Sequence, residues 1–468
     1  MTAAHSGDAP LMLSVSGARG IVGRTMTPEV AAAYGAAFGS WLKQECGQAS
    51  PLVVLGRDGR ASGQALALAA AGGLMSTGCR VTDIGVATTP TVGVMIGQLG
   101  AQGGMAVTAS HNPIQWNGIK CLDGSGLAPP PARAQEIVAR FRERRVEYAA
   151  PETACVYRAD ESAARLHVER VLKHVDVAAI RQRGFTVVLD SVNASGCVAG
   201  RMLLEELGCR ATHLYGECTG VFGHVPEPLE QNLRELAAKV RGTPGASVGF
   251  AQDPDADRLA LVDETGRYVG EEYTLVLAAL RMLQRAGGGH LAANLSTSRM
   301  IDDVAAGFPG SVVHRTAVGE ANVVAALRQH RGILGGEGNG GVIFPPVCWV
   351  RDSLSAMALV LELLAHEGRP LSQIVAGLPR YAMVKHKLDL AAVGGLAAVA
   401  PALERVRTAF AGARVNDTDG VRLDLDRGWV HLRASNTEPI VRIIAEARTA
   451  DEAVALGKEC AHAAGLPW

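Results

Sequence analysis

The 468-residue sequence has few aromatic residues and almost no excess of charge. Phe, Trp and Tyr make up 4% of it, and 45 basic residues nearly balance 46 acidic ones. The formal net charge of -1 creates no global field that would attract nucleic acid or an anionic membrane. Any anionic ligand must therefore be held by a local cluster of donors, and we expect neither a nucleic-acid nor a membrane partner.

Long apolar runs, a leader-type N-terminus and paired cysteines are also missing. The longest apolar runs, such as 65–75 and 357–365, are much shorter than the ~20 residues of a membrane-spanning helix. No cationic stretch precedes an apolar one near the start, as a secretory signal requires. The nine cysteines include no Cys-x-x-Cys pair, which is typical of reduced thiols in the cytosol. We therefore expect a cytoplasmic protein, and leave its oligomeric state open between monomer and homodimer.

The sequence does contain a layout that occurs three times. Each copy begins with a β-branched strand and a helix, continues with a second strand and a second helix, and ends with a third strand, a polar loop and a fourth strand. Such strand–helix alternation favours α/β domains with mixed, mostly parallel sheets. The strands are expected at 52–55, 78–81, 104–107 and 118–122, at 185–189, 208–211, 246–251 and 259–263, and at 290–295, 310–313, 332–334 and 342–344; the helices at 63–77 and 91–99, at 194–207 and 229–240, and at 299–308 and 321–331.

The C-terminal segment breaks this pattern. It offers mostly strands and one closing helix, which indicates a separate α+β domain. We therefore predict three related α/β domains at 1–157, 158–268 and 269–380, followed by an α+β domain at 381–468. The strands of the last domain are expected at 384–390, 420–426, 429–433 and 440–447, and its closing helix from Asp451.

Each copy of the repeat carries its most unusual loop after the third strand, where open α/β sheets bind ligands. In the first copy, the third strand leads into Thr-Ala-Ser-His-Asn-Pro, with Ser110 at its centre. A serine is a weak nucleophile unless its proton is removed or its developing charge is stabilised. Ser110 is therefore a candidate nucleophile, and the alternative is an ordinary serine that caps a helix.

The loop of the second copy places Asp253, Asp255 and Asp257 at alternate positions, followed by Arg258. Three carboxylates so close together repel one another unless a cation neutralises them, and their hard oxygens suit Mg²⁺ or Ca²⁺. An EF-hand loop is the main alternative, because Glu264 stands at its twelfth position. However, Arg258 occupies the sixth position, where that loop needs glycine, and the flanks are typical of strands. We therefore predict a metal site of another kind.

Two further loops offer polar groups to a ligand. The segment 336–341 matches G-x-G-x-x-G, but a strand-like run follows it where a dinucleotide site needs a helix. Its glycines favour close approach of the backbone to a ligand, with Glu337 and Asn339 as hydrogen-bonding groups; a plain glycine-rich turn is the alternative. In the last domain, a guanidinium, two hydroxyls and an amide form a donor cluster suited to phosphate, unless they belong to a polar hairpin loop. These residues are Arg433, Ser435, Asn436 and Thr437.

Taken together, the loops resemble those of the α-D-phosphohexomutase superfamily. Thr-Ala-Ser-His-Asn-Pro, Asp-x-Asp-x-Asp-Arg, Gly-Glu-x-x-Gly and Arg-x-Ser-Asn-Thr-x-Pro follow one another in the family's order across essentially the whole chain. The resemblance implies four domains around a central active-site cleft. It also implies an isomerase that interconverts hexose 6-phosphate and hexose 1-phosphate through a phosphoserine and a hexose 1,6-bisphosphate.

The resemblance further implies roles for individual residues. Ser110 would be the phosphoserine, and it would share Mg²⁺ with Asp253, Asp255 and Asp257. The general base is left open between Lys120 and His111. The implied positions near the reacting phosphoryl group are Arg19, His111, Lys120 and Arg258; those that bind the sugar are Thr316, Gly319, Glu337 and Asn339; and those that grip the second phosphate are Arg433, Ser435, Asn436 and Thr437.

Two departures from the family pattern bear on the substrate. Asn339 and Gly341 stand where many bacterial members have Ser and His, and Pro254 stands where Gly is common. The Asn/Gly version resembles sequences, many of them archaeal, assigned as phosphoglucosamine mutases. We therefore expect conversion of glucosamine 6-phosphate to glucosamine 1-phosphate, with phosphomannomutase/phosphoglucomutase as the alternative.

Readings outside this class are a non-catalytic calcium- or glycan-binding protein and a serine hydrolase. The hydrolase reading lacks the G-x-S-x-G and S-x-x-K contexts around Ser110.

Overall fold

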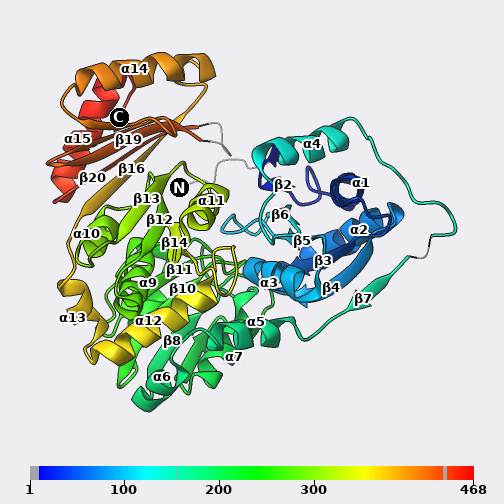
Figure 1. The fold of residues 1–468 in the computed structure, drawn as a ribbon, viewed down its shortest axis with the longest axis horizontal. Coiled ribbons are helices and arrows are strands. Elements are labelled where there is room, and N and C mark those ends of the chain that lie inside the picture. The colour runs from blue at the N-terminus through cyan, green and yellow to red at the C-terminus, as the bar shows by residue number, and fades with distance from the viewer. Residues whose placement is uncertain (1–9, 154, 436–439) are drawn as a thin grey trace. The chain divides into compact units, whose positions relative to one another are not determined.

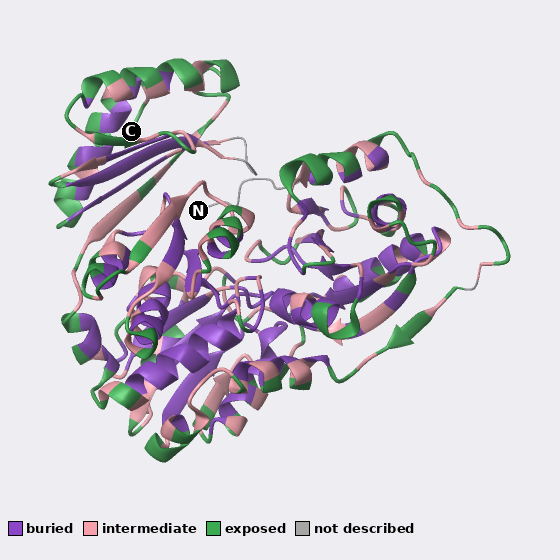
Figure 2. Cartoon of the chain, in the orientation of Figure 1, coloured by how far each residue is buried: buried purple, intermediate pink, exposed green. Residues whose placement is uncertain are grey.

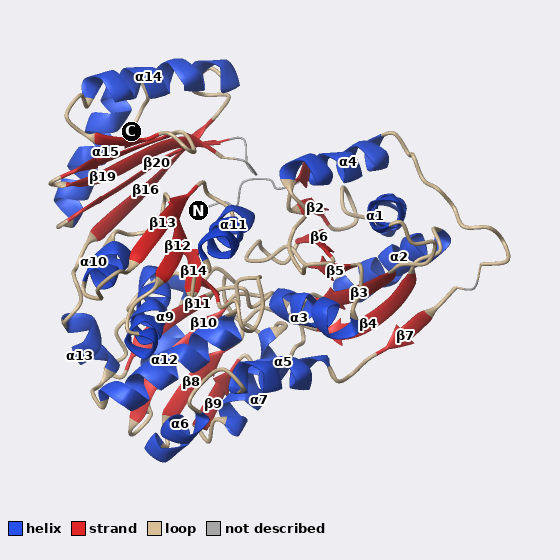
Figure 3. Cartoon of the chain, in the orientation of Figure 1, coloured by secondary structure: helices blue, strands red, loops and turns tan. Residues whose placement is uncertain are grey.

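The fold comes from a computed structural model that describes residues 10–153, 155–435 and 440–468 (Figure 1). The chain divides into two compact units. The first comprises Met1–Arg281 and Asn339–Val375, and the second comprises Met282–Gly338 and Ala376–Trp468. Helices and strands alternate through most of the chain (Figure 3).

The first unit begins with a seven-stranded sheet in the order β1-β2-β6-β5-β3-β4-β7. Its strands β3, β4, β5 and β7 are parallel, whereas β1, β2 and β6 add antiparallel pairings. The elements are β1 (Met12–Ser14), β2 (Gly17–Ile21), α1 (Pro28–Cys46), β3 (Leu52–Arg57), α2 (Gly63–Ser76), β4 (Arg80–Val86), α3 (Thr89–Leu99), β5 (Gly103–Val107), β6 (Trp116–Asp123), α4 (Pro131–Arg142) and β7 (Tyr157–Ala159).

Helices cover both faces of this sheet, as the period of two along β3 requires. Val53 and Leu55 belong to a core shared with α1 and α2, and the intervening Val54 belongs to a second core shared with α3. The central strands β2, β3, β5 and β6 are largely buried, whereas the edge strand β7 is exposed (Figure 2). Because both faces are covered, the loops at the strand ends are what this domain offers to a ligand.

A four-stranded sheet in the order β11-β10-β8-β9 follows in the same unit. Strands β8, β9 and β10 are parallel, and β11 returns antiparallel to β10. The elements are α5 (Ala163–Leu172), α6 (Val177–Arg183), β8 (Thr186–Asp190), α7 (Gly196–Glu206), β9 (Arg210–Leu214), the 3-10 turn η2 (Glu230–Asn232), α8 (Arg234–Gly242), β10 (Ala246–Gln252) and β11 (Leu259–Asp263). Helix α9 (Glu271–Ala286) begins in this unit, and its last residues, from Met282, belong to the second.

The remainder of the first unit is β15 (Gly341–Ile343), α12 (Ser353–Glu367) and α13 (Leu371–Ala376). Helix α12 begins at an Asp352 cap, whose carboxylate accepts from the backbone N–H groups of Leu354 and Ser355. Every residue from Ser353 to Leu364 is buried. A helix that is apolar on all sides is a core helix, and this one contacts α5, α6 and α7.

The second unit contains three parallel strands in the order β13-β12-β14 and an antiparallel sheet in the order β16-β20-β19-β18-β17. Helix α15 begins with a capping box between Thr449 and Glu452. The elements are β12 (His290–Asn294), α10 (Met300–Ala306), β13 (Val312–Thr316), α11 (Glu320–His330), β14 (Leu334–Glu337), β16 (Ala382–Asp389), η3 (Leu396–Ala398), α14 (Val399–Ala409), β17 (Arg414–Asn416), β18 (Val421–Leu425), β19 (Gly428–Ala434), β20 (Ile440–Ala447) and α15 (Ala450–Ala464).

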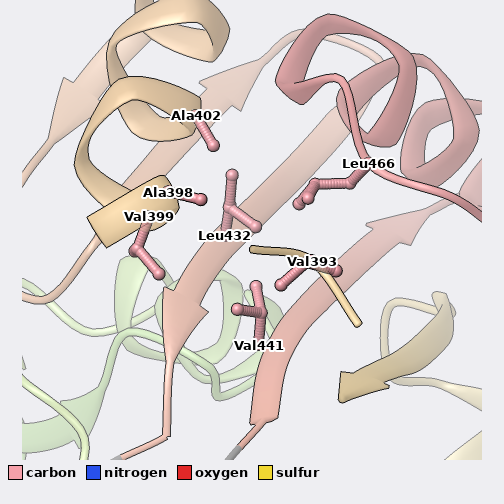
Figure 4. Close-up of a pocket in the computed structure, with 7 residues that line it drawn as sticks. All are labelled: Val393, Ala398, Val399, Ala402, Leu432, Val441 and Leu466. Carbon is pink, nitrogen blue, oxygen red and sulfur yellow. The ribbon is translucent and has the colours of Figure 1, made fainter. Parts of the chain in front are cut away.

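The core of the antiparallel sheet encloses a small void of about 10 Å³ (Figure 4). Its lining is apolar and includes Val399, Leu432 and Val441. A space of this size holds one water molecule at most, and apolar walls give that water no partner. The void is therefore a packing gap and no sugar site.

The predicted fold class is confirmed: three α/β domains precede an α+β domain. Some elements differ from the expectation. The helix expected at 229–240 begins only at Arg234, because 230–232 form a 3-10 turn. Strand β14 runs on through Glu337, so that the first half of the glycine-rich segment lies within a strand. Strand β7 extends the first sheet beyond residue 157. The sequence pattern did not predict the strands β1, β2 and β17 or the helices α1, α4, α5, α6, α9, α12, α13 and α14.

The described residues contain no helix that is both long and apolar enough to span a membrane.

Candidate active site

Ser110 lies three residues beyond the end of β5, in a strained turn. Its φ is 50°, in the left-handed region that residues other than glycine seldom adopt. Its backbone N–H donates to Oγ1 of Thr108 at 2.8 Å. Its hydroxyl donates to Oδ2 of Asp253 at 3.1 Å and lies 3.4 Å from Nδ1 of His111. The turn therefore directs the serine oxygen at the aspartate loop, 143 residues further along the chain.

The three predicted aspartates occupy the tight turn between β10 and β11. Asp253, Asp255 and Asp257 are at most 1% exposed, and each offers a ligand oxygen within 4.8 Å of the others. Within the described part of the chain, the Oδ1 atoms of Asp255 and Asp257 are buried and have no hydrogen-bond partner. Strands flank the turn, whereas helices flank an EF-hand loop, so the EF-hand reading is wrong. Buried carboxylate oxygens without partners fit a hard divalent cation.

Cations surround the aspartates. Lys120 of β6 donates to Oδ2 of Asp255 at 2.5 Å and to Oδ2 of Asp257 at 3.3 Å. Arg351 donates to the same oxygen of Asp257 at 2.6 Å. The Nε of Arg258 lies 3.8 Å from Oδ1 of Asp257. The pocket therefore carries both signs of charge, which suits a ligand that combines phosphate with a divalent metal.

Burial and these neighbours shift the pKa values in opposite directions. Burial, together with Asp255 and Asp257, raises the pKa of Asp253 well above its usual range. Burial also favours a higher pKa at Asp255, but the positive charge of Lys120 outweighs this effect, so the pKa of that carboxyl is lowered. Burial lowers the pKa of Lys120, yet the two carboxylates raise it overall. Lys120 is therefore charged at neutral pH.

Arg19 and His111 complete the surroundings of Ser110. Arg19 of β2 donates to Oδ1 of Asn112 at 3.4 Å, just beyond the serine. Burial, followed by the charges of Arg258 and Arg19, lowers the pKa of His111 to about 2. The imidazole is therefore neutral at physiological pH.

The second half of the glycine-rich segment adjoins the aspartate turn. The carbonyl of Gly340 accepts from the backbone N–H of Leu259, directly after Arg258, at 3.0 Å. Asn339 Oδ1 accepts from Gly341 N–H at 3.3 Å. A Cβ at position 341 would lie only 2.3 Å from Cδ of Arg351. Because residue 341 is glycine, the side chain of Arg351 has the space that it needs to reach Asp257.

The predicted sugar-binding residues of the second unit gather around Glu337. Its Oε1 accepts from Nδ2 of Asn294 at 2.8 Å and from the backbone N–H of Gly319 at 3.3 Å. Gly319, with a φ of 125°, is the N-cap residue of α11, and Thr316 ends β13. The carboxylate is 6% exposed. These contacts fix the turn 316–319 against the end of β14.

Asp419 joins this turn to the predicted phosphate-binding loop. Its Oδ2 accepts from the backbone N–H of Val318 and from Nε of Arg433, each at 2.9 Å. Among the residues that the structure describes, none provides a hydrogen-bond partner for the buried Nη2 of Arg433, which leaves a donor for an anion. The backbone N–H of Ser435 donates to the carbonyl of Ile440 at 2.8 Å. Two further residues predicted for this loop, Asn436 and Thr437, lie outside the described residues.

Comparison with known proteins identifies this arrangement. Four descriptions of one family match the chain in order. Its "Phosphoglucomutase/phosphomannomutase, alpha/beta/alpha" domains I, II and III match residues 12–147, 165–266 and 270–381, and its C-terminal domain matches residues 384–463. The chain belongs to the phosphoglucomutase/phosphomannomutase family.

Individual relatives match over nearly their full length. A phosphoglucomutase/phosphomannomutase of Thermococcus kodakarensis is 39% identical over 93% of this chain and 94% of its own. A probable phosphoglucosamine mutase of Methanopyrus kandleri is 38% identical over 95% of each chain. The crystal structure of a phosphoglucomutase/phosphomannomutase family protein from Burkholderia thailandensis superposes with a TM-score of 0.84, at 28% identity and 97% coverage of both chains.

Membership of this family establishes the reaction class. The protein is a phosphohexomutase, an isomerase that interconverts hexose 6-phosphate and hexose 1-phosphate through a 1,6-bisphosphate intermediate. The predicted resemblance is thereby confirmed.

Several residues at these mutase loops escaped prediction from the sequence. Arg351 and Asp419 are single charged residues in otherwise ordinary segments, and only their contacts with Asp257 and Arg433 reveal them. Thr89, whose hydroxyl donates to Oδ2 of Asp255 at 2.8 Å, lies two residues before the helix predicted at 91–99 and was not singled out. A signal did exist for Asn294, because it lies near the carboxyl end of the strand predicted at 290–295, where open α/β sheets bind ligands.

Proposed function

We propose that this mutase transfers phosphate through Ser110 and that its preferred pair of substrates is glucosamine 6-phosphate and glucosamine 1-phosphate. The observation that carries the first part is the 3.1 Å hydrogen bond from the Ser110 hydroxyl to Asp253, inside a cluster of three buried carboxylates. A serine oxygen held there has cations on both sides to offset the charge of a phosphoryl group.

In the proposed reaction, a hydroxyl of the sugar phosphate forms a bond to phosphorus while the bond from phosphorus to Ser110 Oγ breaks. The sugar hydroxyl loses its proton, and Ser110 is left as a hydroxyl once a proton has been supplied. The guanidiniums of Arg19 and Arg258 and the ammonium of Lys120 stabilise the charge spread over the transferring oxygens. The bisphosphate then reverses its orientation and returns its other phosphate to Ser110.

Glu337, Arg433 and the residues around them are proposed to bind the part of the substrate that does not react. Glu337 would accept hydrogen bonds from sugar hydroxyls, assisted by Asn339 and the turn 316–319. The partnerless Nη2 of Arg433 would bind the distal phosphate together with Ser435, Asn436 and Thr437.

The resident cofactor is proposed to be Mg²⁺, held by Asp253, Asp255, Asp257 and the Ser110 oxygen. The partnerless oxygens of Asp255 and Asp257 support this assignment. When bound, the ion would supply Lewis-acid stabilisation of phosphoryl oxygens.

Support for the amino sugar comes from the relatives. Several that are 34–38% identical are named probable phosphoglucosamine mutases. The 39% identical relative from Thermococcus kodakarensis is named phosphoglucomutase/phosphomannomutase, which keeps mannose and glucose phosphates as the alternative. All nine cysteines are free, in keeping with the proposed cytoplasmic location.

The nucleophile is tested by replacing Ser110 with alanine. We expect the Ser110→Ala protein to lose turnover by at least about a thousandfold and to lose the mass increment of one phosphoryl group that the wild-type chain acquires from a hexose 1,6-bisphosphate. Ser125→Ala, at an exposed turn of the same domain, is the matched control and should retain both. Full turnover by Ser110→Ala would refute the phosphoserine.

The substrate is tested by measuring kcat/KM for the 6-phosphates of glucosamine, mannose and glucose with one enzyme preparation and added bisphosphate. The highest value is expected for glucosamine. Rates for mannose or glucose phosphate far above that for glucosamine phosphate would replace the substrate assignment and leave the phosphoserine intact.

A further inference from the structure

Arg60 lies beneath the turn that carries Ser110, and it is itself almost completely buried, at 1% exposed. Arg60 lies three residues after the end of β3 and 50 residues before Ser110. Its nearest acidic partner is Asp58, whose Oδ2 accepts from Nε at 3.0 Å.

Four carbonyl groups of the serine turn converge on this one guanidinium. Nη2 donates to the carbonyls of Ser110 at 2.7 Å and Asn112 at 2.6 Å. Nη1 donates to those of Pro113 at 2.8 Å and Trp116 at 2.9 Å. With the bond from Nε to Asp58, all five N–H donors of the side chain are in use. No donor is left for a substrate phosphate, so Arg60 acts on the turn alone.

Asp58 ties the other side of the turn to the same arginine. Its Oδ2 also accepts from Oγ1 of Thr108 at 2.7 Å, and that hydroxyl accepts from the backbone N–H of Ser110 at 2.8 Å. Both the N–H and the carbonyl of Ser110 are therefore held by one buried network. A left-handed conformation at a non-glycine residue is unfavourable and persists only where its surroundings enforce it.

A loop of the second domain closes over Arg60. The ring of Phe222 lies against the guanidinium, with 4.9 Å between Cζ and the ring centroid. A Cβ at Gly220 would lie 1.9 Å from the carbonyl oxygen of Gly59, so only glycine permits this approach. Arg60 is thus clamped between the serine turn and the loop 219–222.

We propose that Arg60 is a positioning residue that holds Ser110 in its strained, transfer-competent orientation, and that Phe222 keeps Arg60 in place. This inference rests on the proposed role of Ser110 as the phosphoserine. A misplacement of about 1 Å in a reacting group can cost about a hundredfold in rate. The rate of phosphoryl transfer should therefore require the planar guanidinium with its five donors. Lysine would supply the positive charge but could not make the same set of hydrogen bonds.

The test compares Arg60→Lys, Arg60→Met and Phe222→Leu with the control Arg80→Lys, an exposed arginine of the same sheet. Single-turnover transfer from bisphosphate to Ser110 is followed by intact mass. We expect transfer and kcat to fall about a hundredfold in Arg60→Lys, further in Arg60→Met, and about tenfold in Phe222→Leu, with KM within about twofold of wild type. A purely structural role would lower Tm but leave these rates unchanged in the folded protein.

The outcomes separate this inference from the proposed function. If folded Arg60→Lys transfers phosphate at the wild-type rate, the proposed role of Arg60 is wrong. If the Arg60 variants do not fold, an unchanged transfer rate in Phe222→Leu overturns that role instead. A wild-type chain that takes up no phosphate at Ser110, together with an active Ser110→Ala, would overturn the proposed phosphoserine and with it the role of Arg60.

Discussion

At the scale of single residues, the site depends on Gly341 because it lacks a side chain. The space beside its Cα is filled by Arg351, which donates to Asp257 at 2.6 Å.

We predict that Gly341→Ala lowers kcat about tenfold while the protein remains folded. The new methyl group would displace Cδ of Arg351 and break its bond to Asp257. The φ of Gly341 is not positive, so no backbone strain accompanies the change. Gly72→Ala, at an exposed position of α2 where a Cβ meets nothing within 4 Å, is the control and should be fully active. Steady-state kinetics decide, and an unchanged kcat in Gly341→Ala would show that the Arg351 contact is dispensable.

Asp419 supports a second prediction at this scale. Asp419→Asn keeps an oxygen but removes the charge that orients Arg433, so we expect kcat/KM for hexose phosphate to fall about tenfold, mainly through KM. Asp417→Asn, two residues away and 71% exposed at its side chain, should be neutral. A fall confined to kcat, with KM unchanged, would contradict a role of Asp419 in binding.

At the scale of elements, β19 carries a buried histidine whose neutral form is part of the fold. His431 is 0% exposed. Its Nε2–H donates to the carbonyl of Asp419 at 2.6 Å, and its Nδ1 therefore accepts from Oγ of Ser296 at 3.0 Å. Burial lowers its pKa to about 4, whereas an unfolded histidine titrates near 6.5.

We therefore predict that the folded protein loses stability at acid pH because His431 is neutral in β19. Between pH 6.5 and 4 the unfolded chain binds a proton at this residue that the folded chain does not, so stability falls as the pH drops, by on the order of 3 kcal/mol in all. Tm should decline less steeply over this range in His431→Gln than in the wild type. His462→Gln, exposed on α15, should follow the wild-type slope, and equal slopes in all three proteins would refute the role of His431.

At the scale of the whole molecule, the turn 253–258, which is the proposed Mg²⁺ site, places three carboxylates in the interior. Three carboxylates that are at most 1% exposed repel one another, and this repulsion is a cost that a bound cation would remove. Ligand binding to the folded state alone adds stability of about 2.7 kcal/mol at a concentration one hundred times Kd.

We predict that saturating Mg²⁺ raises Tm and that a chelator reverses the rise. The increment should be largely lost in Asp255→Asn and retained in Glu161→Gln, which changes an exposed carboxylate of the same unit. Turnover should require Mg²⁺. A Tm increment and full activity that persist in Asp255→Asn would place the metal elsewhere.

The sequence by itself determined the family, the fold class and most of the strands, because period-two apolar runs and four polar motifs are local properties of the chain. Only the tertiary structure decided which side chains meet. Arg60, Arg351 and Asp419 carry no motif, and their partners lie 50, 94 and 14 residues away. Such contacts depend on how sheets and loops pack. A guanidinium can donate to a carbonyl or a carboxylate only where the folded backbone places the two groups next to each other.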